Sequence, residues 1–184
     1  MTDPNEAQAA QQSVGDFSQI TGLAFVERLF DGSLGPPPMV KLLPFTLLRP
    51  EPGKIELRAT PDERILNLTK TVHGGWIMMM LDTAMSLAAL TTLGQGEVGP
   101  THETSVKFVR PIGADAGQLR VVGQVLSRGR SVITLEGTIE DTRERVLAHG
   151  TSTCLIVRKG VSPNRYAPSR QTPTSTRFDS GVGR

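Results

Sequence analysis

The stretch HGGWIMMMLDTAMSLAALTTL, residues 73–93, decides the fold. From Trp76 to Leu93 it is apolar nearly all round, and its single charged residue is Asp82. Such a run approaches the length of a membrane span. However, a carboxylate near its middle and strand-like segments on both sides favour a helix buried in a globular protein. The stretch therefore predicts a long central helix that other parts of the chain cover.

Strand-like segments flank the predicted helix. They occupy residues 45–49 and 54–60 before it, and residues 104–110, 119–128, 131–140 and 146–157 after it. An amphipathic helix is predicted within residues 17–34, before the prolines at 36–38. Because the strands do not alternate with helices, the order indicates an α+β fold in which an antiparallel sheet is wrapped around one long buried helix.

Composition indicates one globular domain at residues 17–157, with a flexible leader at 1–16 and a tail at 158–184. The domain carries 14 Lys/Arg and 14 Asp/Glu, so the sequence pI of about 9.0 arises in the tail, which we expect to be disordered. A basic tail on a neutral domain does not indicate nucleic-acid binding. The N-terminus lacks a signal-like pattern and Cys154 has no cysteine partner, so we expect a cytoplasmic protein with no membrane partner.

Motifs of other enzyme classes do not fit their required context. Residues 94–99 spell G-x-G-x-x-G, but a helix precedes them and a strand follows, which is the reverse of a dinucleotide fingerprint. We predict a glycine-rich connection there. No G-x-S-x-G is present for a serine hydrolase, and His73, His102 and His149 lack the spacing of metal ligands.

The candidate site lies where residues 67–75, NLTKTVHGG, enter the central helix. The first N–H groups of a helix have no intrahelical acceptor and carry the positive end of its dipole, which suits an oxygen that becomes negative during acyl transfer. The alternative interpretation is that Gly74 and Gly75 only permit tight packing, and that His73 is a capping or core residue. Asp82 lies about 10 Å beyond Gly75 at the usual helical rise. Since an unpaired buried carboxylate is costly, we expect Asp82 either to have a strong structural partner, with Ser86 a candidate, or to perform chemistry.

Five motifs stand in order along the chain: His73-Gly74-Gly75, Asp82-Thr83-Ala84, Thr101-x-Glu103, Arg110-Pro111 and Ser127-Arg128-Gly129-Arg130. In order and spacing, over roughly Phe17 to Val157, they resemble the PaaI-type hotdog thioesterases. The resemblance implies a hotdog fold and hydrolysis of an acyl-CoA thioester, with coenzyme A as part of the substrate and with no other cofactor or metal.

The resemblance also implies roles for individual residues. Asp82 would be the nucleophile or general base, and the Gly74 N–H would polarise the thioester carbonyl. The remaining implied site residues are Asn67 and His73, which shape the loop, Thr101, which helps hold the attacking water, and Arg128, Gly129 and Arg130, at the nucleotide end of coenzyme A. One departure is Lys70, which stands where relatives commonly have glycine.

Assembly is implied as well: a homodimer or a dimer of dimers, in which Asp82 of one subunit faces Gly74 of the other. Two further functions stay open from the sequence. One is a non-catalytic acyl-CoA-binding hotdog protein. The other is a hotdog dehydratase, for which His73 is the only candidate base.

Overall fold

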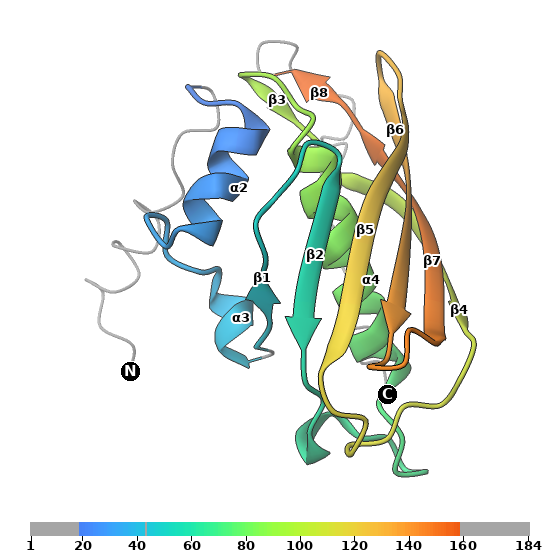
Figure 1. Ribbon diagram of the computed structural model, residues 1–184. Helices are drawn as coiled ribbons and strands as arrows, with labels where there is room; N and C mark the ends of the chain where they lie inside the picture. Colours follow the sequence, from blue (N-terminus) through green and yellow to red (C-terminus); the bar gives the residue numbers. More distant parts are fainter. Residues whose placement is uncertain (1–18, 43, 159–184) are drawn as a thin grey trace, which may run out of the picture.

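The computed structural model describes residues 19–42 and 44–158 (Figure 1). The expected leader at residues 1–16 lies outside the described residues, and so does the expected tail at 158–184 apart from Arg158, which belongs to β8. The elements in chain order are α2 (Gly22–Phe30), α3 (Pro38–Leu42), β1 (Thr46–Leu47), β2 (Lys54–Ala59), the 3-10 helix η1 (Glu63–Ile65), α4 (Gly74–Leu90), β3 (Glu97–Val98), β4 (Thr101–Phe108), β5 (Leu119–Arg128), β6 (Val132–Glu140), β7 (Val146–Leu155) and β8 (Val157–Arg158).

A six-stranded antiparallel sheet, in the order β1-β2-β5-β6-β7-β4, curves around α4 (Figure 1). Alternate residues of its strands face the helix, so that Ile55, Leu57 and Ala59 of β2 are buried while the residues between them are not. On α4 the residues turned to the sheet, among them Met80, Leu81 and Met85, are fully buried. This is the hotdog arrangement predicted from the sequence.

A stripe of glycines brings the helix close to the sheet. Gly123 of β5 pairs with Gly137 of β6, and Gly137 pairs with Gly150 of β7, so the three lie side by side beneath α4. A Cβ atom at Gly123 would lie 2.3 Å from the backbone C and O atoms of Ala84. The α4 backbone therefore occupies the space that a side chain at position 123 would need. This short distance between helix and sheet also determines how far the opposite face of α4 lies from the sheet.

Several predicted boundaries differ from those of the structure. The first helix lies within residues 17–34 as predicted, but an additional short helix, α3, begins at the prolines that were expected only to break the chain's first helix. β1 has only two residues, and the long strand predicted at 146–157 divides into β7 and β8. It divides because Val157 leaves the sheet and pairs with Val98 of β3, which periodicity over so few residues does not reveal.

The expected glycine-rich connection at residues 94–99 is confirmed. It runs from α4 to β4, contains the short strand β3, and has Gly96 at a φ of 71°. Within residues 19–42 and 44–158, no helix combines the length and the hydropathy that crossing a membrane requires.

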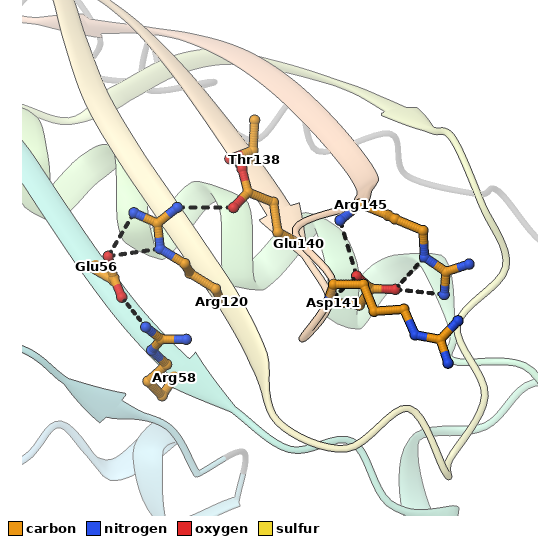
Figure 2. Close-up of polar contacts among 8 residues, drawn as sticks. Glu56, Arg58, Arg120, Thr138, Glu140, Asp141 and Arg145 are labelled. Carbon is orange, nitrogen blue, oxygen red and sulfur yellow. Dashed lines mark hydrogen bonds and ion pairs between the residues drawn. The ribbon is translucent and has the colours of Figure 1, made fainter.

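The outer face of the sheet carries a charged network (Figure 2). Arg120 of β5 bonds to Glu56 of β2 at 2.8 Å and to Glu140 of β6 at 2.9 Å, and thus joins three adjacent strands. Burial disfavours ionisation of Glu56, but Arg120 and Arg58 outweigh it and hold its pKa below the usual value. In the turn between β6 and β7, the hydrogen bond from Arg145 lowers the pKa of Asp141 to about 2.

Replacing Gly123 by alanine tests the close approach of the helix. The new methyl group must displace the α4 backbone, so we expect the free energy of unfolding to fall by about 1–3 kcal/mol or more. Gly35→Ala is the matched control, because nothing lies within 4 Å of a Cβ atom placed there. Urea denaturation measures both variants. Equal stabilities of the two would contradict the proposed contact.

Candidate active site

Asp82 lies on the face of α4 that the sheet does not cover, and it is half-buried in the single chain rather than enclosed. Two hydroxyl groups of β4 donate hydrogen bonds to its Oδ1 atom, Thr101 at 3.1 Å and Thr104 at 3.2 Å. Among the described residues, no protein group donates to Oδ2. The carboxylate is therefore held by one oxygen, and its other oxygen is free to react. Ser86 is not its partner, since that hydroxyl donates to the Thr83 carbonyl oxygen.

Thr104 and Ser152 are members of this cluster that the sequence analysis missed. The two hydroxyl oxygens lie 3.1 Å apart, and the buried Ser152 hydroxyl also donates to the Glu103 carbonyl oxygen at 2.9 Å. The alternation in β4 was recognised in the sequence, and it places Thr104 and Val106 on one face of the strand. What the sequence does not contain is the pairing of Thr104 with Ser152 across β4 and β7, which depends on strand order.

Cys154 lies beside the same cluster, opposite Thr101 in the pairing of β4 with β7. It is fully buried. Burial raises the pKa of the thiol, and the nearby charge of Asp82 adds to that effect. The thiol thus stays protonated near neutral pH, and it is not a candidate nucleophile.

The start of α4 forms the second part of the site. His73 is the N-cap, and its Nδ1 atom accepts a hydrogen bond from the Gly75 N–H at 2.9 Å. Among the described residues, no acceptor bonds to the Gly74 N–H. The Gly74 backbone borders a cavity of about 360 Å³ whose wall includes Ile77 and the half-exposed Phe108. An unused N–H at a positive helix terminus is able to stabilise a negative oxygen.

Asn67 organises the loop that leads to this helix. Its Oδ1 atom accepts from the Thr69 N–H at 2.9 Å, the Thr69 hydroxyl at 2.8 Å and the Thr71 N–H at 3.2 Å. Its Nδ2 atom donates to the Thr71 hydroxyl at 2.9 Å. Lys70 within the loop has a φ of 62°, the left-handed region that favours glycine. The lysine therefore keeps a glycine-like backbone conformation, and the Asn67 hydrogen bonds hold it there.

Arg128, Gly129 and Arg130 lie elsewhere, at the end of β5 and in the turn to β6. Arg128 is not a free cation, because it bonds to the buried Glu97 of β3 at 2.8 Å. Arg158 of β8 bonds to the other oxygen of Glu97, also at 2.8 Å. The Gly94 N–H, together with both arginines, holds the pKa of Glu97 below its usual value against the effect of burial. Arg130 is exposed.

The structure thus brings the expected residues together in three groups rather than one. Asp82 and Thr101 meet at the middle of α4, Asn67 and His73 flank Gly74 at its N-terminus, and the arginines lie near its C-terminal end (Figure 1). In the part of the chain that the structure describes, no three His, Cys, Asp or Glu side chains are grouped as metal ligands.

Comparisons with known proteins bear on this arrangement. A family model described as the thioesterase superfamily matches residues 69–148. Rv1847 of Mycobacterium tuberculosis, a presumed esterase by name, is 34% identical over 126 residues, which cover 66% of this chain and 81% of that protein.

Two solved structures share the fold. The Escherichia coli PaaI protein of the phenylacetic acid degradation operon is 18% identical with a TM-score of 0.64, over 76% of this chain and 96% of that one. The protein smu.793 of Streptococcus mutans, solved with acetyl-CoA bound, is 21% identical with a TM-score of 0.57, over 62% of this chain and 89% of that one.

Lys70→Gly tests the strain in the loop. Glycine adopts a positive φ without the steric cost that a Cβ atom brings, so we expect the free energy of unfolding to rise by about 1 kcal/mol. Lys70→Ala is the control, because alanine removes the charge but retains the strain. Thermal unfolding of the three proteins measures the effect. A rise of the same size in Lys70→Ala would assign the gain to charge instead of backbone conformation.

Proposed function

Because this chain belongs to the thioesterase superfamily, with the hotdog fold of the PaaI type, we propose that it hydrolyses an acyl-CoA thioester to the free acid and coenzyme A. The observation that carries the proposal is a pair of chemical groups on α4. One oxygen of the Asp82 carboxylate has no protein donor among the described residues, and the Gly74 N–H has no acceptor among them. The acetyl-CoA bound to the Streptococcus mutans neighbour supports a coenzyme A ligand.

Two forms of the reaction fit this geometry. As a general base, Asp82 Oδ2 takes a proton from water, and the oxygen of that water attacks the thioester carbonyl. As a nucleophile, Oδ2 attacks the carbonyl itself, and water then hydrolyses the resulting anhydride. In both, the carbonyl oxygen becomes negative and accepts a hydrogen bond from Gly74, and the C–S bond breaks to release the coenzyme A thiolate, which takes up a proton. Neither form needs a further cofactor.

The distance along α4 supports a site that is shared between two copies of the chain. Gly74 and Asp82 are eight residues apart, which at the helical rise is about 12 Å, whereas reacting atoms must come within about 3–3.5 Å. One thioester carbonyl therefore cannot contact both groups of the same chain. We propose a homodimer, or a dimer of such dimers, in which Asp82 of one subunit faces Gly74 of the other.

The surface near β4 supports this assembly. β4 is an edge strand of the sheet, so its outer backbone groups are available to another strand. Large apolar side chains near it are exposed, namely Phe108 at 55%, Val109 at 49% and Met78 of α4 at 42%. A second copy that covers this edge would bury them and would place its own helix N-terminus beside Asp82.

The arginine turn is our proposed contact for the phosphates of coenzyme A. Because Glu97 already neutralises part of the charge of Arg128, Arg130 is the more available of the two cations, and the Gly129 backbone lets a ligand come close. The cytoplasm remains the proposed compartment, from the sequence alone.

Asp82→Asn tests the chemistry. The amide keeps the size of the side chain but loses the negative charge, so we expect kcat to fall by ~10²–10⁴, while acyl-CoA still binds and the protein stays folded. Release of coenzyme A from an acyl-CoA panel, followed with a thiol reagent, measures kcat. Ser86→Ala is the control on the same helix. A folded Asp82→Asn protein with wild-type turnover would refute the mechanism, and binding without turnover in the wild type would indicate a non-catalytic binder.

Mixing two inactive variants tests the shared site. Gly74 is the first helical residue after the cap and follows the extended backbone of His73 (φ −63°, ψ 134°), so the backbone admits proline, which removes the N–H. A Cβ atom at this position would lie 3.1 Å from Cζ of Phe108, so the half-exposed Phe108 ring must shift slightly.

Asp82→Ala and Gly74→Pro subunits, unfolded and refolded together in equal amounts, should recover about one quarter of wild-type activity, because half of the dimers are mixed and each has one complete site. No recovery, with mixed dimers demonstrated by mass spectrometry, would place the whole site in one chain.

A further inference from the structure

An apolar cavity of about 180 Å³ lies on the β1 side of α4, and we call it the β1-side cavity. Its walls come from three consecutive elements near the start of the described chain, α2, α3 and β1, and from α4. One side is lined by Leu29 of α2, Met39 of α3, Phe45 just before β1, and Leu47 of β1. The other side is lined by Thr83 and Leu87 of α4. Figure 1 shows α2 and α3 together on this side of the sheet, away from β4.

The β1-side cavity is lined by Thr83, the residue that follows the proposed catalytic Asp82 in the chain. Thr83 follows Asp82, so their side chains leave the helix about 100° apart. Leu87 stands four residues beyond Thr83 on the same face, so these two side chains form a strip that runs from Asp82 toward the C-terminal end of α4. Thr101 and Thr104 hold Asp82 from the β4 side. A carbonyl at Asp82 thus has hydroxyl groups on one flank and the β1-side cavity on the other.

The wall formed by α2 is attached firmly to α4. The Gly22 N–H, at the start of α2, donates to the Leu93 carbonyl oxygen at 3.0 Å. A Cβ atom at Gly22 would lie only 1.8 Å from the Leu90 carbonyl oxygen, so the two helices meet at backbone contact. The α2 wall of the cavity is therefore fixed in position relative to α4.

The chemistry of the walls selects the ligand. Among the described residues that line this cavity, Thr83 alone is polar, whereas the lining of the cavity of about 430 Å³ between residues 111–116 and 141–147 includes Asp115, Asp141, Arg143 and Arg145. An apolar space excludes the phosphates and amides of coenzyme A and favours hydrocarbon. The acyl group is the apolar part of the proposed substrate.

We propose that the β1-side cavity binds the acyl group of the thioester and limits its length. This rests on the proposed acyl-CoA hydrolysis at Asp82. A cavity of about 150 Å³ holds benzene, so this one accommodates about six to eight carbon atoms. The substrate class is then short to medium acyl-CoA, and Leu87 and Thr83 are its specificity-determining residues.

The test compares straight-chain acyl-CoA thioesters from two to sixteen carbons, with kcat/KM and the dissociation constant measured for each on the full-length protein. For the wild type we expect kcat/KM to rise about fourfold per methylene up to about eight carbons and then to level or fall. Leu87→Ala should move the maximum to chains about three carbons longer, and Leu87→Phe should move it to shorter ones. Leu126→Ala, at an exposed side chain on β5, should leave the wild-type profile in place.

The outcomes separate the cavity from the reaction. If the thioesters are hydrolysed but both Leu87 variants retain the wild-type profile, the acyl group binds elsewhere and this inference is wrong, while the proposed function stands. If no thioester is hydrolysed, the dissociation constants decide. A change in the chain length that the Leu87 variants bind most tightly supports acyl binding in the cavity without the reaction, and the same preferred length as in the wild type overturns this inference. Should the Leu87 variants fail to fold, Thr83→Leu, which adds bulk to the same α4 wall of the cavity, must shift the preference to shorter chains.

Discussion

The close approach of α4 to the glycine stripe is the contact on which the rest of the molecule depends. Gly123, Gly137 and Gly150 occur in three adjacent strands and in register, so the helix backbone meets the sheet with no side chain between them at Gly123. The sheet curves around the helix as a result, and the strands beyond β7 and β2 reach its flanks. Both the proposed catalytic carboxylate and the β1-side cavity stand on those flanks.

The position of Asp82 follows from the close approach of α4 to the sheet. Because α4 lies close to the sheet, the edge strand β4 lies beside the helix face that carries Asp82. The Thr101 and Thr104 hydroxyls therefore reach one oxygen of the Asp82 carboxylate. The other oxygen remains without a protein donor among the described residues. A carboxylate oriented through one oxygen keeps the second available for reaction, and the buried Ser152 behind Thr104 ties that arrangement to β7.

The loop that precedes α4, residues 67–73, positions the Gly74 N–H. The proposed role of the Gly74 N–H requires that this group stay available at the start of the helix. The neighbouring Gly75 N–H already donates to the His73 side chain. Asn67 fastens the preceding turn with hydrogen bonds to Thr69 and Thr71, and in that setting Lys70 adopts a backbone conformation that suits glycine. Local strain is thus tolerated because the surrounding hydrogen bonds determine the loop.

The sequence by itself determined the central helix, the α+β class and the strands from β4 to β7, because hydrophobic period and turn residues are local properties of the chain. It also determined that Asp82 is exceptional, since a single charge in an apolar helix is visible without any structure. Only the tertiary structure decided that Thr104 and Ser152 join Asp82, that Glu97 neutralises Arg128, and that α2, α3 and β1 enclose an apolar space beside Thr83. These facts depend on strand order, register and helix placement. They bring together residues far apart in sequence, and no local pattern encodes such contacts.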